Sequence, residues 1–240
     1  MTYEMEKYLK LLILFLTMLS CTSTETQQNI TPSNLPNMNE NNPKRTFLAL
    51  GDSYTIGESV DEKDRWSMQL IDLLKNDFNF NKQDIIARTG WTTAELTQAI
   101  NAKNLVSQYD LVSLLIGVNN QYRGQSLDTY RVEFKELLNI STKFAKNDAK
   151  KVIVLSIPDW GKTPFAKGQD AQKIASEIDA FNNVAKEECK KANVVFVDIT
   201  EITRKNTDTS MFATDGLHYS GKMHRLWASE ALKVASDILK

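Results

Sequence analysis

From residue 46 onward, short hydrophobic runs alternate with stretches in which hydrophobic residues recur at helical spacing. Several of the runs are hydrophobic without interruption, which is typical of strands that are covered on both faces. Strands that alternate with helices in this way predict a parallel sheet with helices packed on both faces. The expected strands are residues 46–51, 84–89, 109–117, 151–157 and 194–199.

Four stretches predict amphipathic helices, because their hydrophobic residues recur every three or four positions. Thr92 and Glu95 have the spacing of a capping box, which predicts the start of a further helix. We interpret the hydrophobic stripes as parts of the core rather than as a cofactor site. The four stretches are residues 66–74, 127–138, 174–185 and 227–238.

The start of the chain has the features of an export signal. The run LLILFLTMLS follows Lys10 and ends directly before Cys21. It is shorter than the roughly 20 residues that a membrane-spanning helix needs, and it has the size of a signal-peptide core. A cysteine in this place resembles the lipidation site of bacterial lipoproteins, although Met18 and Leu19 depart from the usual residues. An uncleaved anchor or an ordinary signal peptide is the alternative.

The lipoprotein resemblance implies a signal peptide over residues 1–20, export to the bacterial cell envelope and membrane attachment through a lipid on Cys21. Residues 21–45 are rich in Asn, Thr, Gln and Pro, so they predict a flexible tether to a domain over residues 46–240. Acylation of Cys21 would leave Cys189 without a disulfide partner. We expect Cys189 to be a small buried residue on a helix.

Charge and motif spacing restrict the partners. The formal net charge is −1 and no long block of Lys or Arg occurs, which argues against nucleic acid as a partner. No cluster has zinc-ligand spacing, and no glycine-rich phosphate loop is present. We therefore expect neither a metal nor a cofactor. The sequence does not indicate an oligomeric state.

Candidate chemistry lies where the strands end, which is where sites form in parallel sheets of this kind. Ser53 directly follows the first hydrophobic run, and a serine hydroxyl needs a base to become a nucleophile. The chain has two histidines, His218 and His224. His218 follows Asp215 by three residues, so one loop can present both a base and the carboxylate that orients it. We expect His224 to be a surface or helix-packing residue.

An attack on a carbonyl also needs fixed donors for the negative oxygen that develops. The backbone N–H groups of Ser53 and Gly90 and the side-chain amide of Asn119 are candidates. Each of these residues has an ordinary explanation by itself, as a turn former or helix cap. Their joint occurrence after successive strands favours acyl transfer.

The residues just described fall into four ordered blocks, and these blocks resemble the SGNH, or GDSL-type, hydrolase family. The resemblance extends over nearly all of residues 46–240. It implies a three-layer α/β/α, flavodoxin-like fold with a five-stranded parallel sheet. The blocks are GDS with Ser53, RTGWTT with Gly90, GVNN with Asn119, and DGLH with Asp215 and His218.

The resemblance further implies catalytic Ser53, Asp215 and His218 and an acyl-serine intermediate. Asn120 stands where many members have Asp, and Tyr219 stands where many have Pro. Both departures could reshape the substrate pocket.

The expected function is therefore hydrolysis of a small-molecule carboxylic ester. Family members act on lysophospholipids, acetylated sugars, thioesters and aryl esters, and a long-acyl lipase is less expected here because no extended apolar lid is visible. The alternative is an inactive carbohydrate- or envelope-binding lipoprotein on the same fold. Candidate substrate-binding residues are Asp52, Asn120, Arg123 and Trp160, and the same loops offer the aromatic residues Trp66, Tyr122 and Phe165.

Overall fold

The computed structural model describes residues 42–103, 105 and 108–240, all of which belong to the unit formed by residues 34–240. The predictions for the signal peptide, for Cys21 and for most of the tether lie outside the described residues. Within the described ranges, no helix has both the length and the hydrophobicity that crossing a membrane requires.

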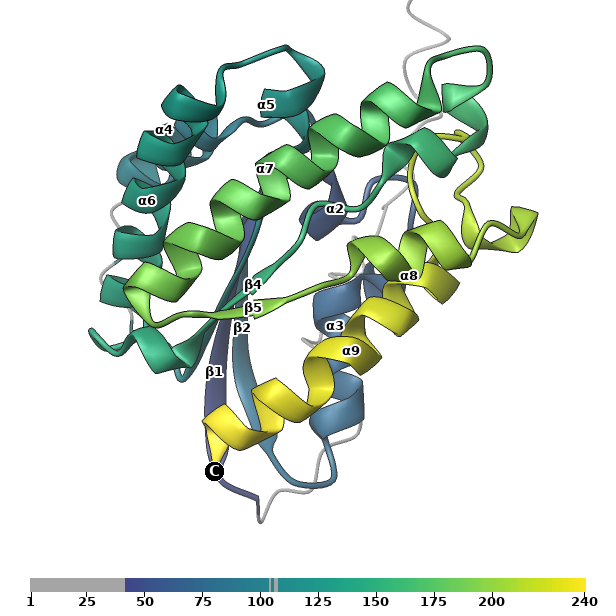
Figure 1. Cartoon of the computed structure of the whole chain (residues 1–240). Coiled ribbons are helices and arrows are strands. Elements are labelled where there is room, and N and C mark those ends of the chain that lie inside the picture. Colours follow the sequence, from purple (N-terminus) through teal and green to yellow (C-terminus); the bar gives the residue numbers. More distant parts are fainter. Residues whose placement is uncertain (1–41, 104, 106–107) are drawn as a thin grey trace, which may run out of the picture. The chain divides into compact units, whose positions relative to one another are not determined.

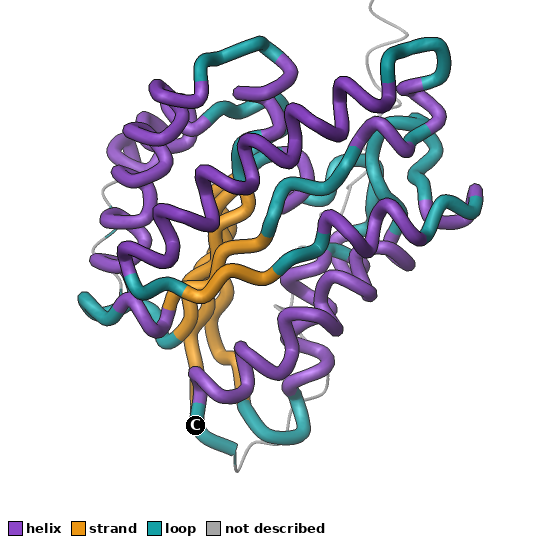
Figure 2. The backbone as a smooth tube through the Cα atoms, viewed as in Figure 1, coloured by secondary structure: helices purple, strands orange, loops and turns teal. Residues whose placement is uncertain are grey.

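A five-stranded sheet, parallel throughout, forms the centre of the fold (Figure 2). The strand order is β2-β1-β3-β4-β5. The direction of chain progression therefore reverses between β1 and β3, and this switch point is where parallel sheets form their sites. The strands are β1 (Lys44–Gly51), β2 (Asn79–Ala87), β3 (Leu111–Leu115), β4 (Val152–Leu155) and β5 (Val195–Val197).

Helices cover both faces of the sheet, which confirms the predicted three-layer α/β/α architecture (Figure 1). One layer contains α4 (Thr93–Lys103), α6 (Leu127–Phe144) and α7 (Ala171–Ala192). The other contains α3 (Trp66–Leu74), α8 (Thr200–Lys205) and α9 (Gly221–Leu239). The short helices α2 (Ser53–Ile56) and α5 (Val118–Tyr122) follow β1 and β3. The remaining short elements are the 3₁₀ turns η1 (Glu62–Asp64), η2 (Ala149–Lys151), η3 (Trp160–Lys162), η4 (Pro164–Ala166) and η5 (Thr209–Met211).

Two strands begin earlier than their hydrophobic runs. β1 includes Lys44 and Arg45, which the sequence places in the tether, and Arg45 donates hydrogen bonds of 3.1 and 2.7 Å to the carbonyl of Leu239. β2 begins at Asn79, which pairs with Lys44. It is an edge strand in which buried and exposed positions mix, so its first half carries polar residues and no hydrophobic run marks it.

The predicted capping box, the predicted burial of Cys189 and the helix-packing alternative for His224 are confirmed. The N–H of Thr92 donates to the Glu95 carboxylate at 2.8 Å just before α4. Cys189 is fully buried on α7, and burial raises the pKa of its thiol to about 12. His224 is a helix-packing residue, since its Nδ1 accepts a 3.1 Å hydrogen bond from the N–H of Trp66 and its ring stacks on Trp227.

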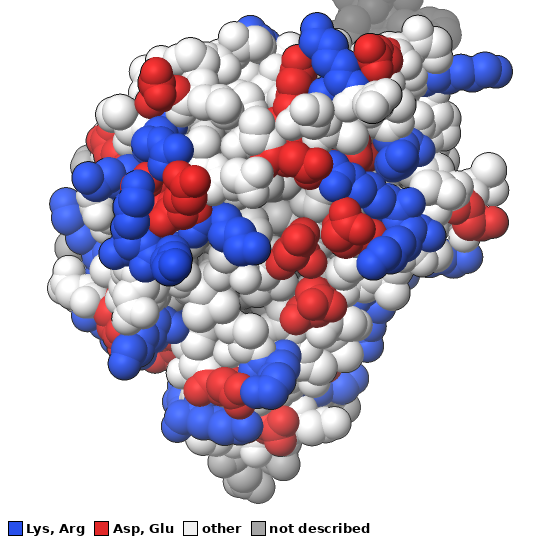
Figure 3. Space-filling model, viewed as in Figure 1, with Lys and Arg blue, Asp and Glu red and all other residues white. Residues whose placement is uncertain are grey.

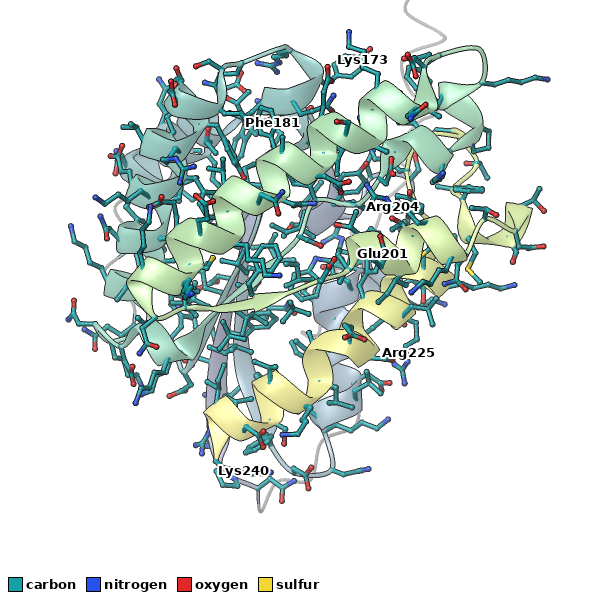
Figure 4. The ribbon with its side chains drawn as sticks, viewed as in Figure 1. Lys173, Phe181, Glu201, Arg204, Arg225 and Lys240 are labelled. Carbon is teal, nitrogen blue, oxygen red and sulfur yellow. The ribbon has the colours of Figure 1, made fainter. Side chains whose placement is uncertain are left out.

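An ion-pair network around Arg204 fixes the loop that follows β4. Its guanidinium donates to Asp159 and Asp179, each at 2.8 Å, and to Glu201 at 3.0 Å. Figure 4 shows Arg204 between α7 and α8. The Tyr219 hydroxyl donates to the carbonyl of Asp159 at 2.7 Å, so the loop after β4 is tied to the segment that precedes α9.

Charged side chains of both signs are interspersed on the face that carries α7 and α9 (Figure 3). Many of them form pairs at the surface, such as Lys233 with Asp237 and Arg225 with Asp72. Exposed pairs of this kind contribute little to stability, so the fold depends mainly on its apolar core.

Candidate active site

Ser53 lies at the carboxyl end of β1, as the first residue of α2, and is only 5% exposed. The turn needs glycine before it, because a Cβ on Gly51 would lie 2.4 Å from the carbonyl oxygen of Leu115 in β3. Asp52 caps the short helix, and its Oδ1 accepts a 3.0 Å hydrogen bond from the N–H of Tyr54. Gly51 and Asp52 therefore each have a local structural reason, and Ser53 begins the helix that Asp52 caps.

Asp215 and His218 form a hydrogen-bonded pair in the loop before α9. Oδ2 of Asp215 lies 2.7 Å from Nδ1 of His218, and Oδ1 accepts from the N–H groups of Leu217 and His218, each at 2.9 Å. The Ser59 hydroxyl donates to the same carboxylate at 2.7 Å. Although partial burial raises the pKa of Asp215, these hydrogen bonds outweigh it and hold the pKa well below its usual range.

The ionised carboxylate fixes the state of the imidazole. A proton on Nδ1 satisfies the bond to Asp215, which leaves Nε2 as the acceptor in the neutral ring. The ring is also held by an edge-to-face contact with Tyr54, whose centroid lies 6.0 Å away. Tyr54 in turn packs on Tyr219 and Trp227, so the residue after Ser53 connects its helix to the loop that carries His218.

Ser53 and His218 lie on the wall of one cavity of about 190 Å³. No hydrogen bond joins these two side chains among the described contacts, and such bonds are often long until substrate binds. The cavity brings together all four predicted sequence blocks. Its wall is formed by Ser53, Tyr54, Thr89, Gly90, Val118, Asn119, Tyr122, Trp160, Phe165, Leu217 and His218.

The two other predicted oxyanion donors face the same space. Gly90 adopts a φ of +87°, a conformation that glycine accepts and other residues rarely do. Its carbonyl accepts a 2.6 Å hydrogen bond from Nη2 of Arg123. Asn119 donates from Nδ2 to the carbonyl of Trp91 at 2.9 Å. A carboxamide nitrogen has two N–H groups, so this bond orients the amide and leaves the second N–H for a ligand.

Asp52 and Asn120 are predicted to contact substrate, but both are completely buried and neither is part of the cavity wall. Asn120 donates to the Thr93 hydroxyl at 2.6 Å and accepts from the N–H of Thr93 at 3.1 Å. It joins α5 to the start of α4. Burial raises the pKa of Asp52 to about 7, despite the opposing backbone hydrogen bonds, of which that from Tyr54 is the strongest.

The other substrate-binding candidates are placed differently from one another. Trp160 contributes to the wall, together with Tyr122 and Phe165. Arg123 is not on the wall, and its second contact is an ion pair with Glu95 at 3.2 Å. Trp66 is fully buried at the beginning of α3, in the core.

Three groups that support the site are not identified by the sequence pattern: Ser59 on the carboxylate of Asp215, Tyr54 against the His218 ring, and the Tyr219 hydroxyl on the loop after β4. Their contacts join residues that are distant along the chain. The sequence distinguishes Tyr219 only as a departure from the family pattern. Within the described ranges, no group of three or more His, Cys, Asp or Glu side chains is arranged to hold a metal ion.

A flavodoxin-like α/β/α sheet with a serine, a histidine–aspartate pair and amide donors in one cavity defines the class of protein. The model of the GDSL-like lipase/acylhydrolase family matches residues 49–226 of this chain. The chain therefore belongs to that family and is an ester hydrolase. No curated protein sequence matches the chain.

Solved structures share the fold at low sequence identity. The lipase/acylhydrolase from Enterococcus faecalis is 21% identical, with a TM-score of 0.58 over 82% of this chain and 97% of that chain. The esterase EstA from Pseudoalteromonas is 16% identical, with a TM-score of 0.61 over 81% and 98%. A mutant of Axe2, an acetyl-xylooligosaccharide esterase from Geobacillus, is 19% identical, with a TM-score of 0.61 over 81% and 95%.

Proposed function

We propose that the protein hydrolyses short-chain carboxylic esters through an acyl-enzyme on Ser53. His218 takes the proton of the Ser53 hydroxyl as Oγ attacks the ester carbonyl, and then delivers this proton to the leaving alcohol. Asp215 keeps the imidazole in the required tautomer and stabilises its positive charge. Water then attacks the acyl group, with His218 again serving as the base.

Three donors are available for the oxyanion in this proposal. The backbone N–H groups of Ser53 and Gly90 and the free N–H of Asn119 come from the ends of three neighbouring strands. Donors that are fixed before the reaction cost no reorganisation when the charge develops. The hydrogen bond from Asn119 to the carbonyl of Trp91 holds its amide in advance of substrate binding.

The observation that carries the proposal is the convergence of Ser53, the Asp215–His218 pair and Asn119 on one small cavity. A volume of about 190 Å³ is below the roughly 300–1,000 Å³ of sites for drug-sized ligands. This size supports a short acyl group rather than a long one. Two of the proteins that share the fold are named esterases.

A fluorophosphonate probe tests the nucleophile directly, because it reacts with activated serines. We expect the probe to label the wild-type domain and not the Ser53→Ala variant. Hydrolysis of p-nitrophenyl acetate is expected to disappear with the same substitution. Ser67→Ala is a matched control, since Ser67 is also buried at the start of a helix but lies on α3. Equal labelling of wild type and Ser53→Ala would exclude Ser53 as the nucleophile.

We further propose attachment to the cell envelope through a lipid on Cys21, on the basis of the sequence pattern alone. Incorporation of labelled palmitate into the full chain, and its loss in Cys21→Ser, is the expected result. Labelling that survives Cys21→Ser would contradict the proposal.

A further inference from the structure

A second hollow of about 370 Å³ adjoins the cavity that contains Ser53. The two share Tyr122 and Trp160 as a common wall. The hollow lies where the end of α5 and the loop after η4 meet the first turns of α7, and α5 contacts α7 in the fold (Figure 1). Its lining residues are Gln121, Tyr122, Gly124, Trp160, Gln169, Asp170, Lys173, Ile174 and Glu177.

A chain of polar contacts organises this hollow. The indole N–H of Trp160 donates to Oε1 of Gln121 at 2.8 Å, and Nε2 of Gln121 donates to Glu177 at 2.7 Å. Glu177 pairs with Lys173 at 3.8 Å. Two hydrogen bonds and one ion pair therefore connect the lining from the cavity wall to the surface, where Figure 4 shows Lys173 near the beginning of α7.

The side chains of the hollow keep hydrogen-bond donors and acceptors that are free to bind a ligand. The ammonium of Lys173 has three N–H donors, and its ion pair with Glu177 at 3.8 Å is too long to be a hydrogen bond. The amide nitrogen of Gln121 has two N–H donors, and the bond to Glu177 uses one of them. The carboxylate of Asp170 accepts from the N–H of Lys173 at 2.9 Å and retains further lone pairs. Hydroxyl groups, which both donate and accept, match a lining of mixed donors and acceptors.

The charge of the lining disfavours an anion. Lys173 is its single cation, whereas Asp170 and Glu177 are both acidic. A phosphate or carboxylate in the hollow would face two carboxylates, and like charges at short range are costly. The polar side chains equally disfavour an acyl chain, which would bury them without hydrogen-bond partners.

The wall shared by the two spaces is aromatic, and Tyr122 is its solvent-exposed member, whereas Trp160 is buried. Tyr122 is 59% exposed and packs edge-to-face on Trp160 at 5.5 Å, and Phe165 is 44% exposed beside the same indole. Among the described residues, these two are the aromatic side chains that stand out as large exposed hydrophobic groups. Both line the mouth of the cavity, where an exposed ring offers an apolar face to the C–H side of a sugar.

We propose that the second hollow binds the alcohol part of the ester, and that this alcohol is an uncharged, polyhydroxylated group such as a sugar. This inference rests on the proposed function. An ester with its carbonyl at Ser53 would place its short acyl group in the small cavity. Its alcohol crosses Tyr122 and Trp160 into the polar hollow, where contact with Lys173 and Asp170 favours hydroxyl groups.

Two acetate esters that differ in their alcohol test the proposal. Acetylated xylobiose and ethyl acetate carry the same acyl group but leaving alcohols of different acidity, so the change in the ratio of their kcat/KM values between the wild type and a variant of the hollow reports binding of the alcohol. We expect the ratio to exceed about ten in the wild type, and a tenfold preference corresponds to about 1.4 kcal/mol. Lysophosphatidylcholine is the third substrate, and a preference for it over acetylated xylobiose would overturn the proposal.

Substitutions in the hollow test whether the preference for the sugar ester arises there. Tyr122→Ala and Lys173→Ala are expected to lower the ratio. The effect of Tyr122→Ala should be about tenfold and mainly in KM for the sugar ester, because contacts with a part of the substrate that does not react bind the substrate and the transition state equally. Both side chains are exposed, so neither change is expected to disturb folding, which the thermal midpoint checks. Lys186→Ala is the matched control, since Lys186 is exposed further along α7 and should leave the ratio unchanged.

The outcomes separate this inference from the proposed function. Hydrolysis of ethyl acetate with Ser53 labelling, but with a ratio near one or a ratio insensitive to Tyr122→Ala, would overturn the alcohol site alone. A wild-type protein that hydrolyses none of the esters and is not labelled at Ser53 would overturn the proposed function. Competitive inhibition of p-nitrophenyl acetate hydrolysis by free xylobiose, weakened in Tyr122→Ala, would support the site independently.

Discussion

Arg123 connects two groups around the proposed oxyanion site. Its Nη2 donates to the carbonyl of Gly90, and its Nη1 pairs with Glu95 in the capping box of α4. The carbonyl of Gly90 belongs to the peptide that follows its N–H. The hydrogen bond from Arg123 to this carbonyl therefore restricts the backbone torsions of Gly90, and with them the direction of the Gly90 N–H.

We predict that Arg123→Ala lowers kcat for p-nitrophenyl acetate by about tenfold and leaves KM nearly unchanged, because small displacements of an oriented donor reduce turnover. Arg123→Lys should restore part of the loss, since an ammonium can still reach one carbonyl but lacks the planar fork. Arg225→Ala is the control, as Arg225 forms a comparable exposed pair with Asp72. A change in KM alone would instead assign Arg123 to substrate binding.

Asn119 is predicted to act more directly. Removal of one oxyanion donor typically costs about 10²–10³ in turnover, so Asn119→Ala should reduce kcat by this factor. Labelling of Ser53 should slow but remain detectable, because the nucleophile and base are still present. Turnover within about twofold of wild type would remove Asn119 from the proposed hole.

The residues proposed to react are marked by short motifs, but the groups that support them are not. Ser53, Asp215 and His218 are recognisable because each stands in a local block with a required residue type. Ser59 donates to Asp215 across 156 positions of sequence, and no local pattern records such a contact. Asp52 belongs to the same motif as Ser53, yet its carboxyl group is buried at the end of β1. The backbone geometry determines this direction, and the motif does not record it.

At the scale of elements, His224 joins the start of α3 to α9. Its Nδ1 accepts from the N–H of Trp66, one of the first groups of α3 that has no partner within the helix. Burial lowers the pKa of His224 to about 3, with a smaller contribution from His218. The folded protein therefore keeps this imidazole neutral, whereas the unfolded chain binds a proton near the ordinary histidine pKa of 6.5.

This difference predicts an acid-dependent loss of stability. The contribution of a group with a depressed folded pKa is present above its unfolded pKa and is lost as pH falls. Between pH 7 and pH 5, protonation of the unfolded chain at His224 should cost about 2 kcal/mol. His224→Gln removes this titration and keeps an acceptor for Trp66. Urea unfolding should show that the wild type loses about 2 kcal/mol more than the variant over this range.

If the free energy of unfolding changed equally with pH in the wild type and in His224→Gln, His224 would not titrate on unfolding. Because the substitution also alters the stack on Trp227, the absolute stability of the variant is expected to be lower at pH 7. The prediction concerns the difference in pH dependence, which that general loss does not affect.

Elements with a strong hydrophobic period were predictable, and those without one were not. The four helical stripes fall within α3, α6, α7 and α9 because each helix buries one face against the sheet or its neighbour. The first half of β2 and the short α5 lack such a period. α5 depends instead on Gly117, whose φ of +130° lets the chain turn beneath the hydroxyl of Tyr130.

At the scale of the whole domain, sheet register brings the parts of the site together. Gly51 at the end of β1 is paired with Leu115 at the end of β3. Both strands therefore end at the same level, and the segments that follow them leave on either side of the switch point. Ser53 and Asn119 are each two residues beyond a glycine in these segments. The loop of His218 reaches the same place because Tyr219 holds it to the loop after β4.

This arrangement leaves a carboxyl group in the interior. Asp52 is completely buried beside Ser53, its Oδ2 has no hydrogen-bond partner among the described residues, and burial raises its pKa from 3.8 to about 7. In the folded protein the group is therefore largely neutral in mildly acidic solution, while the unfolded chain ionises there. Its contribution to stability is complete below pH 3.8 and is lost as pH rises to about 7.

Asp52→Asn tests this assignment, because an amide can accept from Tyr54 through Oδ1 and carries no titratable proton. Between pH 4 and pH 8, the wild type should lose on the order of 4 kcal/mol relative to the variant. The Asp52 contribution to stability falls as pH rises, whereas the His224 contribution falls as pH drops. The two pH dependences therefore partly cancel in the wild type, and each becomes visible when the other residue is replaced. Urea unfolding of the single variants and of Asp52→Asn with His224→Gln measures both. A double variant that retains the full pH dependence of wild type would assign that dependence to other groups.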